Sequence, residues 1–194
     1  EWYALTKALE LKEAQGGEVV VIHAGLADSE QVIRKALAIG ADAAFRIDMD
    51  PTDAYAISVE IANHAKTGGY DLVITGKETI DYNSFEVGGM VAELLDWNAV
   101  ALVSKLDVAG GKATATRDID GGAETVEISL PAVICATKDL AAARIPNMKG
   151  IMASRTKPLT VLAATGADKL TSIASYQTPE KAKECKYVSV DNVA

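Results

Sequence analysis

Three short apolar runs, each followed by a helical pattern, constrain the fold of this chain more than any other feature. The runs are Glu18–His23, Ala43–Ile47 and Asp71–Thr75. Continuous apolar runs of this length are typical of strands that are covered on both faces of a parallel sheet. Strands that alternate with helices across short glycine turns form right-handed crossovers in one open sheet. The sequence therefore predicts an α/β fold built on an open parallel sheet.

Apolar periodicity predicts four helices, over residues 4–14, 28–37, 51–66 and 87–95. Asp28 and Gln31 have the spacing of a capping box for the second helix. Asp50 and Pro51 predict an N-cap followed by proline at the first helical position of the third. The chain begins with a helix, whereas a doubly wound unit normally begins with a strand. We therefore expect that a first strand is missing ahead of residue 1.

The pattern changes after the fourth helix. Strands are predicted over residues 99–108, 112–119 and 125–136, joined by the glycine pairs at 110–111 and 121–122, which are typical of hairpin turns. An antiparallel extension should therefore follow the parallel strands. We expect three regions: an α/β domain over 1–136, an extended arm over 137–163 with a last strand at 157–163, and a tail over 164–194.

Composition and charge exclude several classes of protein. The formal net charge is −8, which argues against a nucleic-acid partner, because phosphate backbones require clustered Lys and Arg. No run of 18 apolar residues occurs, so the chain is not expected to be embedded in a membrane. Cys135 lies in an apolar run, where a reduced, buried thiol is expected, and this favours a reducing compartment.

Several catalytic motifs are absent from the sequence. There is no Gly-x-Gly-x-x-Gly fingerprint, and Gly76-Lys77 is followed by Glu78, not by the Ser or Thr of a P-loop. Neither histidine pairs with a cysteine at metal-ligand spacing, so no metal site is predicted. No nucleophile has a recognisable base beside it. The sequence is therefore not expected to be that of an enzyme.

The segment Gly76–Gly88 is the strongest candidate for a binding site. It leaves the end of a predicted strand and enters a predicted helix. Ligands of open α/β sheets bind at the carboxyl ends of strands, and a helix N-terminus offers free N–H groups to an anion. A phosphate or nucleotide site is one interpretation. An ordinary strand-to-helix loop is the alternative that these residues alone leave open.

Several segments, in order along the chain, resemble the beta subunit of electron-transferring flavoproteins. The similar segments are Arg34–Asp42, Gly76-Lys77 with Ile80-Asp81, Ala115–Val126 continuing through Pro131–Cys135, and Arg144–Met152. The third segment is the most specific. Its matching positions are Arg117, Asp120, Gly121, Gly122, Glu124, Val126 and Pro131. The resemblance covers roughly residues 1 to 162.

The resemblance implies an adenine-nucleotide-binding, Rossmann-like fold and a non-enzymatic role as an electron carrier. The larger alpha subunit of the heterodimer would hold most of the redox FAD. This subunit would hold a second nucleotide, AMP or a second FAD. Flavin dehydrogenases, such as acyl-CoA dehydrogenases, would donate electrons, and a membrane quinone reductase or another acceptor would receive them. A bacterial-type cytoplasm is the preferred location, and the mitochondrial matrix is the alternative.

The resemblance also assigns residues to two sites. The implied nucleotide contacts are Ala24, Gly76, Lys77, Glu78, Thr79, Ile80, Asp81, Tyr82, Asn83, Ser84, Phe85, Glu86 and Val87. The implied partner-recognition residues are Arg144, Met148, Lys149, Ile151 and Met152. The tail is expected to pack on the alpha subunit.

Some positions depart from the family pattern. Glu78 and Glu86 stand where glutamines are frequent, and carboxylates beside a phosphate are unfavourable unless they point away or bind a sugar hydroxyl. Val87 replaces a threonine, as in the electron-bifurcating relatives. We therefore leave AMP and FAD open, with AMP preferred. In the arm, Met148 occupies the place of an anchoring leucine, and its flexible thioether suits an imperfect apolar pocket. Packing of Met148 on its own domain is the alternative.

Two rival functions remain open from the sequence. A stand-alone, stress-type α/β protein could use the same loop to hold ATP or AMP without a partner. An adenylating or pyrophosphatase-like hydrolase would need a glycine- and serine-rich phosphate loop after its first strand, and that segment is not in this sequence.

Overall fold

The structure is a computed structural model, and it describes residues 1–80 and 82–180. The strands are β1 (Val20–Gly25), β2 (Ala43–Asp48), β3 (Leu72–Gly76), β4 (Asn98–Ala109), β5 (Lys112–Ile119), β6 (Gly122–Ser129), β7 (Ala132–Ala136) and β8 (Leu159–Ala163). The helices are α1 (Trp2–Gln15), the 3-10 turn η1 (Ala27–Ser29), α2 (Glu30–Ile39), α3 (Ala54–Gly68), α4 (Val87–Leu95) and α5 (Met148–Ser154).

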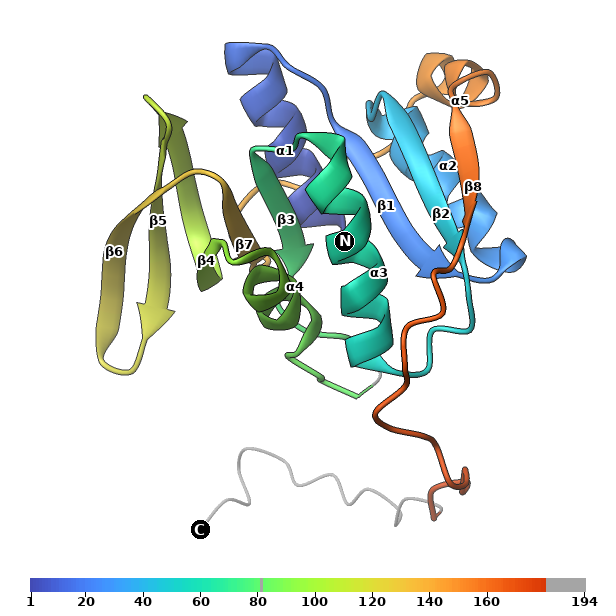
Figure 1. Cartoon of the computed structure of the whole chain (residues 1–194). Coiled ribbons are helices and arrows are strands. Elements are labelled where there is room, and N and C mark those ends of the chain that lie inside the picture. The colour runs from blue at the N-terminus through green and yellow to red at the C-terminus, as the bar shows by residue number, and fades with distance from the viewer. Residues whose placement is uncertain (81, 181–194) are drawn as a thin grey trace, which may run out of the picture.

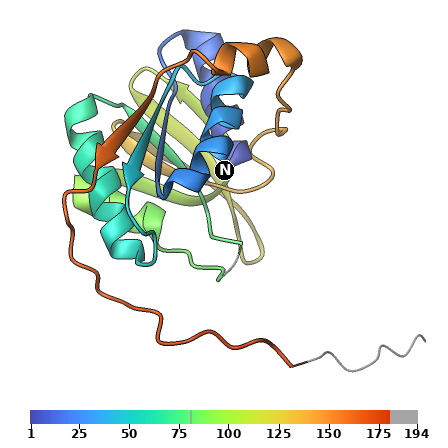
Figure 2. The same cartoon turned by 90° about the vertical axis from the view of Figure 1, so that its right-hand side faces the viewer.

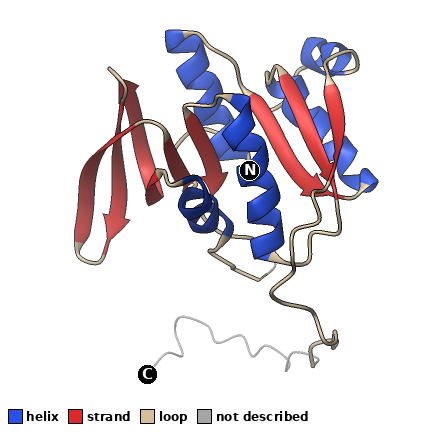
Figure 3. Ribbon diagram, in the orientation of Figure 1, coloured by secondary structure: helices blue, strands red, loops and turns tan. Residues whose placement is uncertain are grey.

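The strands form two open sheets (Figures 1 and 3). The first is parallel, with the order β1-β2-β8. The second has the order β3-β7-β4-β5-β6, in which β3, β7 and β4 pair in parallel and β4, β5 and β6 pair antiparallel. The predicted α/β class and its antiparallel extension are confirmed. Figure 2 shows α3 on one side of the first sheet, and α2 with α5 on the other.

The parallel strands do not form the single continuous sheet that the alternation predicted. In the described structure β1 pairs only with β2, and β3 pairs only with β7, so each strand keeps one free edge. Both edges line one cavity of about 840 Å³, with residues of α1 and α3 also in its wall. Two free parallel edges around an apolar space fit an intervening strand. The expected first strand stays a prediction.

Two predicted helix starts are wrong in detail. The third helix begins at Ala54, not at residue 51, and its cap is Asp53, whose Oδ1 accepts from the backbone N–H of Ala56 at 2.7 Å. The expected capping box of Asp28 and Gln31 does not form. A 3-10 turn occupies 27–29 instead, and α2 begins at Glu30 without a side-chain cap. Both helices therefore begin two or three residues later than predicted.

The strand predicted over 125–136 is two strands. It divides at the Leu130–Pro131 peptide bond, which is cis, into β6 and β7. The change of direction lets β6 pair with β5 at the edge while β7 lies fully buried between β3 and β4. Proline cannot donate to a ladder and is therefore typical of strand boundaries. The two hairpins predicted at the glycine pairs are confirmed by the β4–β5 and β5–β6 pairings.

The arm over 137–163 is more structured than an extended segment. It contains the short helix α5, which packs on α2, and it ends in β8, the last strand that the sequence predicted. β8 pairs in parallel with β2, so the arm closes the outer edge of the first sheet. The arm therefore contributes one strand to the first sheet and one helix that packs on α2.

The tail has neither helix nor strand over its described residues, 164–180, while 181–194 lie outside the described part. The first residues of the tail are held by two carboxylates, one in α3 and one at the N-cap of α3. Glu60 accepts from Thr165 N at 2.7 Å and Gly166 N at 3.2 Å, and Asp53 accepts from Thr171 N at 2.7 Å. Within the described residues, no helix has the length and apolar character needed to cross a membrane.

Candidate functional site

The loop between β3 and α4 starts at the carboxyl edge of the second sheet. Its first amide, Lys77 N–H, still donates to Ala136 of β7 at 3.1 Å, so the strand pairing continues into the loop. The backbone of Gly76 lies against the Glu1 side chain, and a Cβ at Gly76 would lie 2.8 Å from the Cγ of Glu1. Glycine at this position therefore lets α1 begin beside the end of β3.

A small hydrogen-bonded turn shapes the middle of the loop. Thr79 N donates to the Ser84 carbonyl at 3.1 Å, and Asn83 N donates to the Thr79 carbonyl at 3.0 Å. Asn83 adopts a left-handed conformation, with φ of 52°, which asparagine tolerates better than most residues. These bonds bring the two ends of the turn together, while Ile80, at its tip, is fully exposed. Asp81 lies outside the described residues.

The N-terminus of α4 is the chemically distinctive part of the loop. Met90 N–H is the first amide with a helical partner, the Glu86 carbonyl. In the described structure, no acceptor is found for the N–H groups of Val87, Gly88 and Gly89, and Glu86 makes no side-chain cap. Unpaired N–H groups at the positive end of a helix form an anion site. This end of the loop can therefore bind a phosphate.

The close approach of α4 to the sheet depends on Gly88, which is buried. A Cβ there would overlap the Sγ of Cys135 in β7 and would lie 2.8 Å from the Oγ1 of Thr75 in β3. Cys135 is a free, buried thiol, and burial raises its pKa. A neutral thiol packs as a small apolar group. The thiol therefore supports the position of α4 and is not a nucleophile.

The cavity of about 840 Å³ reaches from the gap between β1 and β3 to this loop. A space of this size is within the range of ligand pockets. The predicted contact residues that line it are Gly76, Lys77, Glu78, Thr79, Ser84, Glu86 and Val87. The described residues that were predicted as contacts but do not line it are Ala24, Ile80, Tyr82, Asn83 and Phe85.

Both unusual carboxylates of the loop have partners within the loop. A Glu78 carboxylate oxygen lies 2.9 Å from Lys77 Nζ. The Glu86 carboxylate accepts from Ser84 Oγ at 3.2 Å. The ion pair offsets the negative charge of Glu78, whereas the Glu86 charge is only hydrogen-bonded. The loop is therefore compatible with an anion but is not strongly positive.

Arg46, which the sequence analysis did not assign, holds the turn after β1, and His23 lies beside it. Arg46 is 5% exposed, and its Nη1 donates to the Gly25 carbonyl at 2.9 Å. His23, its register partner on β1, lines the cavity, while Ala24 is buried beside it. Burial lowers the pKa of His23, and the Arg46 charge acts in the same direction. His23 therefore meets the cavity as a neutral imidazole. An arginine within an apolar strand is a sequence signal that marks Arg46 as unusual, but it does not reveal the Gly25 partner.

The arm presents its apolar residues to solvent. Ile145 is 89% exposed and Met148 is 74% exposed, and Ile151 and Met152 on the same helix are also exposed. Arg144 differs from its neighbours, because its guanidinium forms a two-bond pair with Glu13 of α1, at 2.6 and 2.7 Å. This pair raises the pKa of Arg144 and fixes the base of the arm.

Comparison with known proteins identifies the family. A family model described as "Electron transfer flavoprotein domain" matches residues 1–167. The chain belongs to the electron transfer flavoprotein family. The electron transfer flavoprotein subunit beta of Bacillus subtilis is 34% identical, over 92% of this chain and 74% of that protein. The corresponding subunit of Syntrophomonas wolfei is 37% identical, over 91% and 71%. The human subunit is 33% identical, over 82% and 65%.

This electron transfer flavoprotein chain is therefore of the beta-subunit type, and its role lies in electron transport with a flavin in the complex. In the Ala115–Val126 segment, the most specific part of the resemblance, two matching residues pair across the β5–β6 hairpin. Arg117 and Glu124 are register partners on β5 and β6, and Arg117 Nε donates to Glu124 at 2.7 Å. No group of three His, Cys, Asp or Glu side chains among the described residues could hold a metal ion.

Proposed function

We propose that this chain is the beta subunit of a heterodimeric electron transfer flavoprotein and that it holds an adenine nucleotide at the loop between β3 and α4. The observation that supports the nucleotide site is the set of Val87, Gly88 and Gly89 amides, which have no acceptor among the described residues and lie where α4 begins at the cavity. The chain itself makes and breaks no bonds. The alpha subunit holds most of the redox FAD.

AMP is the nucleotide that we propose, and a second FAD, as in an electron-bifurcating relative, is the alternative. The neutral His23 and the hydrogen-bonded Glu86 suit an uncharged sugar or base, since both offer hydrogen-bonding atoms to the cavity. The α4 amides suit one phosphate group. Val87 at the first position of α4 is the feature that favours FAD.

The test is co-expression with the alpha subunit and analysis of the purified, yellow heterodimer. Nucleotides released by denaturation are separated and counted per heterodimer. We expect one FAD and one AMP, whereas two FAD would identify the bifurcating type. A heterodimer that carries FAD but no adenylate beyond it would refute the nucleotide site.

We further propose that α5 docks electron donors of the flavin dehydrogenase class, such as acyl-CoA dehydrogenases. A membrane quinone reductase or another protein would accept the electrons. The exposed Ile145, Met148 and Met152 support this role, because apolar side chains grouped on a surface mark interaction sites. Burial of Met148 would stabilise a complex by about 1.5–3 kcal/mol, which suits a transient partner. Lys149, which is exposed beside them, would speed the encounter.

The tail over 164–194 is proposed to pack on the alpha subunit. The side chains of Leu170 and Tyr176 are 67% and 76% exposed, although Glu60 holds the backbone at Thr165 and Asp53 holds it at Leu170. A segment that is fixed at its base and apolar beyond it suits burial by a partner chain.

The rival function is a stand-alone ATP- or AMP-binding protein that uses the same loop. The exposed apolar residues of the arm and the tail argue against it, since a protein without a partner leaves them in water. A stable, colourless monomer that binds ATP tightly would favour the rival. For the compartment we propose a bacterial-type cytoplasm, with the mitochondrial matrix as the alternative, and the free thiol of Cys135 supports a reducing environment.

A further inference from the structure

Helix α5 has only seven residues, and such a short helix is not stable by itself in water. Asn147 caps its N-terminus, where Oδ1 accepts from Gly150 N at 2.8 Å. Its apolar residues Met148 and Met152 point to solvent rather than into a core. Its stability must therefore come mainly from the contacts that it makes with α2.

Arg34 of α2 satisfies the carbonyl groups at the end of α5. Its Nη1 donates to the carbonyls of Ser154 and Lys157, both at 2.8 Å. The last carbonyls of a helix have no partner within the helix, so a cation beside them supplies the missing donors and matches the helix dipole. The guanidinium therefore ties the last turn of α5, and the segment after it, to α2.

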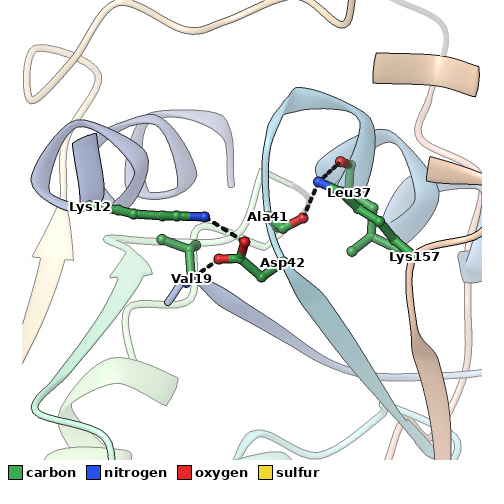
Figure 4. A network of polar contacts seen from close by, with 6 residues as sticks. All are labelled: Lys12, Val19, Leu37, Ala41, Asp42 and Lys157. Atoms are coloured by element: carbon green, nitrogen blue, oxygen red, sulfur yellow. Dashed lines mark hydrogen bonds and ion pairs between the residues drawn. The ribbon is translucent and has the colours of Figure 1, made fainter. Parts of the chain in front are cut away.

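Lys157, in the segment after α5, donates in turn to carbonyl groups at the end of α2 (Figure 4). Its Nζ donates to the carbonyls of Leu37 and Ala41, at 3.0 and 2.6 Å, where α2 ends. Figure 4 also shows the neighbouring Asp42 carboxylate, which accepts from Lys12 Nζ and Val19 N and thereby fixes the turn that follows α2. Each segment thus supplies the cation that satisfies carbonyl groups of the other.

The two helices also touch at Gly150. A Cβ at this position would overlap the carbonyl oxygen of Ala38 in α2. Contact between backbones, with no side chain between them, leaves little freedom for α5 to tilt or slide. The two cations and this contact restrain α5 at three places along α2.

We propose that Arg34 and Lys157 are positioning residues that preform α5 as a docking helix, an inference that rests on the docking function proposed above. A partner that meets a preformed helix loses less entropy on binding than one that must order it. Removal of either cation should therefore weaken docking without altering the nucleotide site or the flavin.

The experiment compares Arg34→Met and Lys157→Met in the heterodimer with Lys35→Met and Arg155→Met. The control residues are exposed cations of the same two segments whose side chains have no polar partner among the described residues. Hydrogen exchange of residues 148–157 and steady-state kinetics with a flavin dehydrogenase are measured. Loss of a charge-assisted hydrogen bond should accelerate exchange there by about tenfold or more. The KM for the heterodimer should rise while kcat stays constant.

The outcomes separate this proposal from the docking function on which it rests. Exchange at control rates in both test variants would overturn the positioning role. Suppose instead that the test variants exchange faster but keep an unchanged KM, while Met148→Ala raises the KM. The positioning role would then also be overturned, because docking would not depend on order in α5. If Met148→Ala leaves the KM unchanged as well, the docking function fails. Should Lys157→Met not fold, Arg34→Lys keeps the charge but removes the guanidinium Nη1 that donates to both carbonyls, and it should give a smaller change of the same sign.

Discussion

A methyl group added at Gly88 should destabilise the protein, whereas the same change at Gly89 should not. Gly88 faces the sheet, where a Cβ would overlap Cys135 Sγ and lie 2.8 Å from Thr75 Oγ1. A Cβ at Gly89 would meet nothing within 4 Å. The two neighbours share a helix turn but face different surroundings, so they form a matched pair.

The magnitude follows from two opposing effects. Replacement of a helical glycine by alanine stabilises by about 0.5–1 kcal/mol through lower backbone entropy in the unfolded chain. Overpacking of a filled core costs about 1–3 kcal/mol. Gly89→Ala should therefore gain about 0.5–1 kcal/mol, and Gly88→Ala should lose up to about 2 kcal/mol, because the Thr75 and Cys135 side chains are too short to move far.

Urea unfolding, followed by tryptophan fluorescence, measures both changes. The double variant Gly88→Ala/Cys135→Ala should recover part of the loss, since removal of Sγ makes room for the new methyl group. Gly88→Ala should also weaken nucleotide binding, because the displaced α4 carries the amides that we propose to bind phosphate. Equal stability of the two single variants would refute the argument that α4 is seated through Gly88.

Three further predictions concern the loop, the tail and the arm. Glu78→Gln should tighten nucleotide binding by about two- to fivefold, since one negative charge is removed. The control Glu93→Gln, near the other end of α4, should leave binding unchanged. Calorimetry measures the affinity of both variants. The pKa of Asp53 is lowered from 3.8 to about 2, so its contribution to stability is present above pH 4 and is lost as the pH falls toward 2. Asp53 accepts from the backbone N–H groups of residues 170 and 171, next to Lys169. Asp53→Asn should weaken these bonds and so speed tryptic cleavage at Lys169 at neutral pH. Met148→Ala should raise the KM with dehydrogenases several-fold, and an unchanged KM with every partner would remove the arm from docking.

The order of the elements was predictable because the apolar runs and the glycine turns act locally. The second and third strand predictions each match an observed strand to within one residue, and α4 was placed without error at 87–95. The cap of α3 was misplaced because Asp50 and Asp53 are both good N-cap residues, and the sequence does not show which one the tail will bond. Asp53 is selected by tertiary contacts with residues 170 and 171 as well as by its own helix.

The loop that the sequence predicted as a binding site lies partly beside the cavity, and binding there stays a prediction. A loop that leads from a strand into a helix N-terminus is a local feature, and the structure places seven of its predicted residues around one cavity. The role of Arg46 was not predictable, because a bond to the Gly25 carbonyl depends on the register of β1 and β2. The same holds for the pairing of Arg144 with Glu13, which are far apart in the sequence.

Helix α2 connects the two regions for which we propose functions. Its N-terminus follows the β1 turn beside His23, and its C-terminus, at Leu37 and Ala38, holds α5 through Lys157 and Gly150. Ten helical residues span about 15 Å, so the arm is held well away from the β1 turn. The same rigid helix fixes the distance between them, so a docked partner would meet the rest of the carrier from a constant position.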